Sequence, residues 1–102
     1  MLSLYRLATI IGYPFIELYF RSRLVNGKED LIRFPERKGI TIKARPAGPI
    51  LWFHAASVGE SLSLLPLISS LLTRHGNINI LVTTGTVSSA SVMAERLPQR
   101  AF

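Results

Sequence analysis

A chain of 102 residues has room for one small domain at most. It is apolar for a soluble protein, with 48% hydrophobic and 18% charged residues. It contains no cysteine, which excludes a disulfide framework, a thiolate nucleophile and a cysteine metal site. Its two histidines, His54 and His75, lack the spacing of metal ligands, so we expect no bound metal.

The net charge of +6 is concentrated in one basic stretch. A basic block is typical of proteins that bind nucleic acid, an anionic membrane surface or an anionic substrate. Because this block directly follows an apolar segment, we favour anionic lipids over nucleic acid. The stretch holds eight basic residues (Arg21, Arg23, Lys28, Arg33, Arg37, Lys38, Lys43, Arg45) and three acidic ones (Glu29, Asp30, Glu36).

The first twenty residues are apolar except for Arg6 and Glu17. Their longest uncharged run, 7–16, is shorter than the roughly 20 residues that span a bilayer. Tyrosines along the segment and arginines at its end are typical of a membrane interface and predict that the following domain is cytoplasmic. We therefore interpret residues 1–23 as a membrane anchor, spanning the bilayer or lying on it. A cleaved signal peptide and a buried first helix of a globular domain are the alternatives.

Residues 24–49 form a basic connector that ends in the sequence Arg-Pro-Ala-Gly-Pro. Two prolines and a glycine cannot continue a helix, so a boundary falls there. A short helix is predicted over 28–38, broken by Pro35. Taken by its sequence context alone, Glu36 in this helix is a solvated surface glutamate whose ion pairs contribute less than about 1 kcal/mol.

The rest of the chain, residues 50–102, reads as two successive strand-helix units. Alternation over 50–56 predicts a strand with Trp52 and His54 on one face, and both faces are apolar enough for a central parallel strand covered on both sides. His54 by itself is more often a structural histidine than a catalyst. A helix follows to about residue 75, and Pro66 predicts a late start or a kink within it.

The second unit consists of a strand over 78–84 and a helix over 87–97, and a third strand begins at 101–102. The order β-α-β-α implies a parallel strand pair and an α/β fold. Two strands are too few for a stable doubly wound sheet. Either partner strands come from another chain, or the sequence is the front part of a longer protein.

Between the first strand and its helix lies the tetrapeptide Ser57-Val58-Gly59-Glu60. It fits a capping box, in which Ser57 and Glu60 satisfy the first free N–H groups of the helix. The functional alternative is that Gly59 lets an anionic ligand approach exposed amides at the helix N-terminus.

These segments together resemble one protein family, the 3-deoxy-D-manno-octulosonic acid (Kdo) transferases that glycosylate lipid A in Gram-negative bacteria. The resemblance rests on an apolar N-terminal segment followed, in order, by GKED at 27–30, ERKG at 36–39, RPAGP at 45–49, WFHAASVGE at 52–60, PLI at 66–68 and LVTTGT at 81–86. It covers essentially the whole chain.

The resemblance implies a GT-B fold, in which two Rossmann-like domains face each other across a cleft and a membrane-associated segment precedes them. It implies transfer of Kdo from CMP-Kdo to the lipid A precursor, lipid IVA, at the cytoplasmic face of the inner membrane, with no cofactor. The catalytic base of the family is the glutamate of its Glu-Arg-x-Gly motif, here Glu36. Arg37, Ser57, Gly59 and Glu60 become candidates for substrate contacts.

Family members are several times longer than this chain, which would lack the CMP-Kdo site, so the resemblance implies a truncated or split reading frame that is inactive alone. The alternative function is non-catalytic: an anchored module that binds anionic lipid, or half of a split enzyme that pairs with a separately encoded C-terminal domain. A nucleic-acid-binding domain would show steeply salt-dependent binding without membranes.

Overall fold

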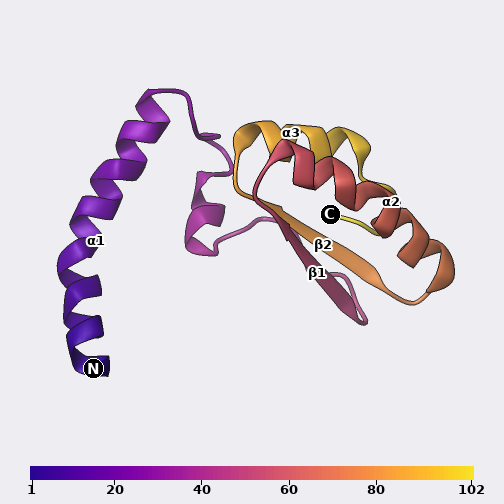
Figure 1. Cartoon of the computed structure of the whole chain (residues 1–102), viewed down its shortest axis with the longest axis horizontal. Coiled ribbons are helices and arrows are strands. Elements are labelled where there is room, and N and C mark those ends of the chain that lie inside the picture. The colour runs from indigo at the N-terminus through magenta and orange to yellow at the C-terminus, as the bar shows by residue number, and fades with distance from the viewer. The chain divides into compact units, whose positions relative to one another are not determined.

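A computed structural model describes all residues, 1–102, and divides them into two compact units, residues 1–39 and 40–102 (Figure 1). The first unit contains two helices and no strand. The second contains the strands and the remaining two helices.

The first unit consists of helix α1 (Leu2–Val25) and the short 3-10 helix η1 (Phe34–Lys38). Pro35 is the second residue of η1, in the first turn, where its missing N–H costs no hydrogen bond, and Gly39 ends the helix in the left-handed conformation at φ +76°. The helix predicted over 28–38 is therefore wrong in extent, because only its last five residues are helical. Within this unit the rings of Phe20 and Phe34 pack edge to face, with centroids 5.6 Å apart.

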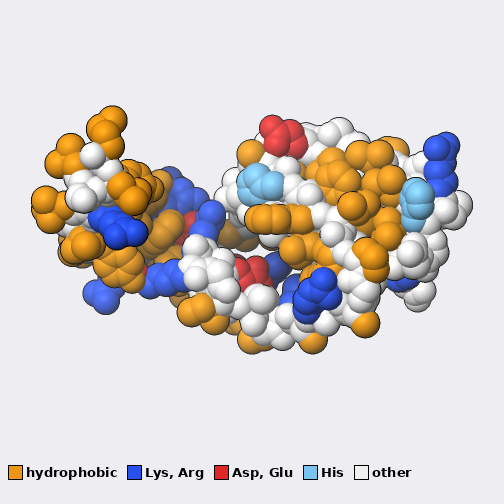
Figure 2. Space-filling model, turned by 90° about the horizontal axis from the view of Figure 1, so that it is seen from below, with side chains coloured by type: hydrophobic (Ala, Val, Ile, Leu, Met, Phe, Trp, Pro, Cys, Tyr) orange, Lys and Arg blue, Asp and Glu red, His pale blue; other side chains and the backbone are white.

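Helix α1 buries none of its residues. Most of its large apolar side chains are more than half exposed, and they are distributed around the helix (Figure 2). No helix of the structure combines the length and the apolar character that crossing a bilayer requires. The membrane anchor over residues 1–23 stays a prediction.

In the second unit, β1 (Ile50–Ala55) and β2 (Asn79–Thr84) form a parallel pair in the register Ile50 to Asn79. Helix α2 (Val58–Arg74) connects them, and α3 (Val87–Arg96) follows β2. Beyond α3, Ala101 forms a parallel bridge with Ile80 on the other side of β2. The predicted β-α-β-α order, the parallel pairing and the beginning of a third strand are confirmed.

Helices α2 and α3 lie on the same side of the two strands (Figure 1). The core lies between these layers and consists of Ile68 and Leu72 from α2, Ile80 from β2 and Met93 from α3. Strands added in one direction through right-handed crossovers place successive helices on one face of a sheet. No helix of the second unit covers the opposite face of the sheet.

The prediction that both faces of the first strand are covered is therefore wrong. Phe53 packs against the core, whereas Trp52 on the opposite face is 69% exposed. Hydrophobic side chains gather on the surface of this unit in the view of Figure 2. We refer to the uncovered side, which carries Trp52 and His54 of β1 beside Leu81 and Thr83 of β2, as the open sheet face.

Pro66 lies inside α2 without delaying its start, so of the two predicted effects of this proline, a late start or a kink, the late start is wrong and the kink stays a prediction. The helix begins at Val58 because Ser57 caps it: the Ser57 side chain accepts a hydrogen bond from the N–H of Glu60. Proline has no N–H, so the carbonyl of Leu62, four residues earlier, receives no intrahelical hydrogen bond from it.

The last part of the predicted connector, residues 40–49, belongs to the second unit. Asn79 fixes it from β2, because its side chain donates to the carbonyl of Ala47 and its backbone N–H to that of Pro49. Gly48 has φ +85°, a conformation that favours glycine. The boundary predicted from the Pro-Ala-Gly-Pro sequence thus forms an ordered bend at the start of the sheet.

Candidate functional site

Glu36, the predicted base, lies on η1 in a two-hydrogen-bond ion pair with Arg33. Arg33 Nε donates to Glu36 Oε1 at 3.1 Å, and Arg33 Nη2 donates to Glu36 Oε2 at 2.9 Å. The Glu36 side chain is 31% exposed and that of Arg33 40%. This geometry is the fork-to-fork arrangement in which guanidinium recognises carboxylate or phosphate.

The backbone at Arg33 is fixed by the side chain of Asp30. Asp30 Oδ1 accepts hydrogen bonds from the N–H groups of Ile32 and Arg33, at 2.9 and 3.1 Å. The turn before η1 is thus fixed at Asp30, and η1 ends at Gly39, whose N–H donates to the carbonyl of Glu36. Both side chains of the ion pair therefore belong to a segment whose backbone is fixed by hydrogen bonds at each end.

Glu29, four residues before Arg33, joins α1 to η1. Its carboxylate, only 5% exposed, accepts from Arg23 Nε of α1 at 2.7 Å. It also accepts two hydrogen bonds from Arg37 of η1, Nε at 3.2 Å and Nη2 at 3.0 Å. Arg37, predicted to contact substrate, therefore already contributes to the folding of this unit.

The charges of this unit shift one another's pKa values. Burial raises the pKa of the Glu29 carboxyl, but hydrogen bonds from Arg23 and Arg37 outweigh burial and lower it overall. A hydrogen bond from Lys38 lowers the pKa of Glu17, and the same contact raises the pKa of Lys38. The hydrogen bond to Glu36 raises the pKa of Arg33.

The capping box predicted at 57–60 is confirmed only for Ser57. Ser57 Oγ accepts from the Glu60 N–H at 3.2 Å, whereas Glu60 Oε2 accepts at 2.7 Å from the N–H of Ala56, the residue before the cap. Ser57 is thus explained as a helix cap and Glu60 as a contact to the preceding backbone, and both remain exposed to solvent. A Cβ atom at Gly59 would meet nothing within 4 Å, so Gly59 is not required there by crowding.

A second loop, which we did not predict as part of the site, lies beside the first. Gly85 follows β2, and its N–H donates to the carbonyl of Ala55 at 3.2 Å. A Cβ atom at Gly85 would lie 3.3 Å from the Ala56 carbonyl oxygen, so the close approach of the two loops favours glycine. Thr86 then caps α3 through the N–H of Ser89. The sequence Thr-Gly-Thr after a strand was the signal for this loop.

These two loops follow the carboxyl ends of neighbouring parallel strands, the edge where open α/β sheets bind ligands. The N-termini of α2 and α3 are both at this edge, and helix N-termini favour anionic groups. Ser57, Gly59 and Glu60 are therefore together at one edge of the second unit. Glu36 and Arg37 are together on η1 of the first.

His54 lies on the open sheet face and not at this edge. Its Nδ1 is 2.9 Å from Thr83 Oγ1. The interpretation of His54 as a structural histidine fits this contact, because Thr83 is its direct partner in the strand register.

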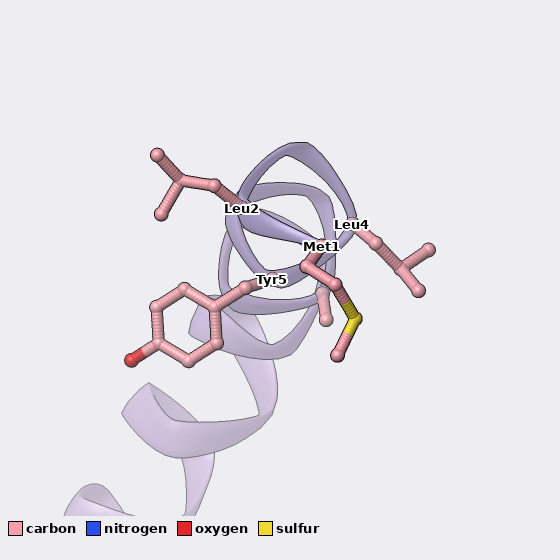
Figure 3. A pocket seen from close by; sticks show the side chains of 5 residues that line it. Met1, Leu2, Leu4 and Tyr5 are labelled. Atoms are coloured by element: carbon pink, nitrogen blue, oxygen red, sulfur yellow. The ribbon is translucent and has the colours of Figure 1, made fainter.

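An apolar hollow at the beginning of α1 is lined by Met1, Leu2, Leu4, Tyr5 and Ala8. The labelled side chains point away from the helix in different directions and do not converge on a common point (Figure 3). The hollow is part of the exposed apolar surface of α1, and the Tyr5 hydroxyl is the one polar side-chain group in its lining. No group of histidine and acidic residues in the structure is placed to hold a metal ion.

Comparison with known proteins identifies the family. The family model described as 3-deoxy-D-manno-octulosonic-acid transferase (kdotransferase) matches residues 32–102. The chain is 40% identical over 95 residues to a probable mitochondrial 3-deoxy-D-manno-octulosonic acid transferase of Arabidopsis thaliana, covering 93% of this chain and 21% of the relative. It is 35% identical over 99 residues to the 3-deoxy-D-manno-octulosonic acid transferase of Rickettsia bellii, covering 97% of this chain and 24% of the relative.

A third relative, from Chlamydophila psittaci and with the same name, is 38% identical over 84 residues, covering 79% of this chain and 18% of the relative. No solved structure is significantly similar to this chain. The chain spans about a fifth to a quarter of the length of the curated relatives that it matches. By the match over residues 32–102, which includes both η1 and the two loops at the sheet edge, the chain belongs to the 3-deoxy-D-manno-octulosonic acid (Kdo) transferase family.

Proposed function

We propose that the chain is the acceptor-side part of a glycosyltransferase that moves Kdo from CMP-Kdo to the lipid A precursor, lipid IVA, in lipopolysaccharide biosynthesis. The observation that carries this proposal is the family match over residues 32–102. The matched relatives are four to five times longer, so the complete GT-B enzyme would take its donor domain from outside these residues.

In this proposal Glu36 is the general base. An acceptor hydroxyl loses its proton as its oxygen bonds to the anomeric carbon of Kdo, while the bond from that carbon to CMP breaks and CMP leaves. A carboxylate within hydrogen-bond reach of the hydroxyl can take the proton. Glu36 suits this role because its carboxylate is partly exposed on a short segment fixed by Asp30 and Gly39.

Arg37, Ser57, Gly59 and Glu60 are the proposed substrate contacts. Ser57 and Glu60 are each exposed at the start of α2, and the amides at the start of this helix favour an anionic group. Arg37 carries a guanidinium fork of the kind that binds phosphate.

We further propose that α1 lies on the cytoplasmic face of the inner membrane. Its exposed leucine, isoleucine and phenylalanine side chains would enter the interface, and its tyrosines would lie at headgroup level. The basic residues after it would meet anionic lipid. The same exposed helix favours the second candidate function, a non-catalytic anchored module that pairs with a separately encoded C-terminal domain.

The test is Kdo transfer from CMP-Kdo to lipid IVA in membranes that contain this chain, alone and with the separately made C-terminal domain of the Rickettsia bellii relative. We expect transfer only with both parts, and its loss in Glu36→Gln. The control Glu95→Gln removes an exposed carboxylate from α3 and should leave transfer intact. Binding of the two parts with no transfer would favour the non-catalytic module, and full activity of Glu36→Gln would exclude Glu36 as base.

A further inference from the structure

Arg33 occupies both carboxylate oxygens of Glu36, one through Nε and the other through Nη2. A general base has to offer a lone pair to the incoming hydroxyl. The lone pairs that face the guanidinium in this geometry are already engaged. The arrangement therefore leaves an incoming hydroxyl only the lone pairs that face away from Arg33, and the others would become available if Arg33 had another oxyanion to bind.

Such an oxyanion has to come from outside the first unit, because every carboxylate within the unit is already bound. Glu29 accepts from Arg23 and Arg37, and Glu17 pairs with Lys38. Asp30 accepts from two backbone N–H groups. The unit has seven basic residues and four acidic ones, so its field favours an anionic ligand.

We propose that Arg33 exchanges its ion pair with the Glu36 carboxylate for an ion pair with the oxyanion of a phosphate-bearing ligand. This exchange would free the Glu36 carboxylate. The inference rests on the proposed role of Glu36 as base. In the exchange Arg33 acts as a positioning residue: it binds phosphate and controls when Glu36 is available. No opening of the fold is needed, since the Arg33 side chain is 40% exposed and that of Glu36 31%.

Phosphate fits this exchange better than another carboxylate. A guanidinium binds either group through two parallel hydrogen bonds. A phosphate monoester carries close to two negative charges at neutral pH and three acceptor oxygens, whereas Glu36 offers one charge and two oxygens. The competition is therefore biased towards phosphate without any change in the geometry of Arg33.

The test measures phosphate binding and does not depend on transfer. The full chain is titrated with inorganic phosphate, and separately with phosphatidylcholine vesicles that contain phosphatidic acid. The readout is the ¹H–¹⁵N resonance of Arg33 Nε. We expect this resonance to move in both titrations if the phosphate group alone is recognised, and only with vesicles if a lipid headgroup is required. No movement in either would overturn the proposal.

Glu36→Gln is the decisive variant. It removes the competing charge, so phosphate should bind about two- to fivefold more tightly, the range that a surface ion pair spans. If the ion pair between Arg33 and Glu36 only stabilised the fold, Glu36→Gln would weaken phosphate binding or leave it unchanged. Glu17→Gln makes the same change of net charge in the same unit, away from Arg33, and should tighten binding less. Equal tightening by Glu17→Gln would show that net charge alone is responsible and would overturn the exchange.

Arg33→Gln should abolish the binding, while Lys28→Gln, which removes a cation without an ion pair, should retain it. Arg33→Lys keeps the charge but loses the fork, and we expect intermediate binding with the fold preserved. Wild-type binding by Arg33→Gln would overturn the proposal. Since Glu36→Gln should bind phosphate more tightly yet transfer no sugar, failure of the exchange and failure of the proposed base are separate results.

Discussion

The indole N–H of Trp52 donates a hydrogen bond across the sheet to the hydroxyl of Thr83, 2.9 Å away. The same hydroxyl lies 2.9 Å from His54 Nδ1, so one threonine of β2 links two side chains of β1. A hydroxyl can accept from the indole and donate to the imidazole at once. These hydrogen bonds lie on the open sheet face, where Trp52 remains 69% exposed.

Trp52 is the only tryptophan of the chain and therefore reports whether the open sheet face is covered. Parallel sheets are normally covered on both sides. With 5-fluorotryptophan incorporated in this chain only, we expect the single ¹⁹F resonance to shift when the separately made C-terminal part of the Rickettsia bellii relative is added. An unchanged resonance in a complex that gel filtration confirms would contradict coverage of this face by that part.

The helices and strands of the second unit could be predicted from sequence because their periodicity and caps are local. Ser57 and Glu60 lie three residues apart, and the leucine and isoleucine spacing of α2 marks the side that packs on the sheet. The open sheet face could not be predicted, since an apolar strand looks the same whether one or two layers cover it. The apolar side chain of Trp52 suggested that this face of the strand is buried, whereas Trp52 is exposed.

In the first unit, the contact between Arg33 and Glu36 follows from their spacing of three residues, although sequence alone does not show that both oxygens are engaged. The pairing of Glu29 with Arg23 and Arg37 bridges six and eight residues and depends on the turn between α1 and η1. Sequence reasoning therefore described Arg37 as a substrate contact and did not detect its structural contact.

Ser57 offers a way to separate capping from substrate contact. Ser57→Ala removes the side-chain acceptor for the Glu60 N–H and should lower the free energy of unfolding by about 1 kcal/mol. Ser57→Asn can replace the cap and should restore stability. Urea unfolding followed by circular dichroism measures both. Transfer that stays low in the stable Ser57→Asn variant would support a substrate contact, and full transfer would leave Ser57 as a cap alone.

Ile68 is the clearest test of where the core lies. It is fully buried between α2 and the sheet, so Ile68→Ala should lower the free energy of unfolding by about 2–5 kcal/mol through lost burial and the cavity left behind. The neighbouring Leu67 is 46% exposed, and Leu67→Ala should cost far less. Equal destabilisation by the two substitutions would mean that α2 does not pack as described.

Gly85 tests the close approach of the two loops at the sheet edge. Gly85→Ala would place a Cβ atom 3.3 Å from the Ala56 carbonyl oxygen, so the loops would have to separate by a few tenths of an ångström. Gly59→Ala meets open space but lies in α2, where alanine favours the helix, so the wild-type chain is the reference. We expect a lower unfolding midpoint in urea for Gly85→Ala than for the wild type. A midpoint for Gly85→Ala at or above that of the wild type would show that the contact is loose.

Acid should loosen the first unit through Glu29. The pKa of this carboxyl is lowered in the folded unit, so the unfolded chain binds its proton more readily. The stabilising contribution is present above the ordinary glutamate value near 4.5 and is lost as the pH falls through the lowered folded value. The ¹H–¹⁵N resonance of Arg23 Nε, 2.7 Å from the carboxylate, should follow this loss.

Glu29→Gln removes the titrating group, so the acid response of the Arg23 resonance should disappear while the resonance itself moves to the position of an unpaired guanidinium. Lys38 provides the opposite sign in the same unit: its pKa is raised by Glu17, so its contribution is present below its ordinary value near 10.5 and is lost at higher pH. An acid response of the Arg23 resonance that persists unchanged in Glu29→Gln would show that another carboxyl controls the joint between α1 and η1.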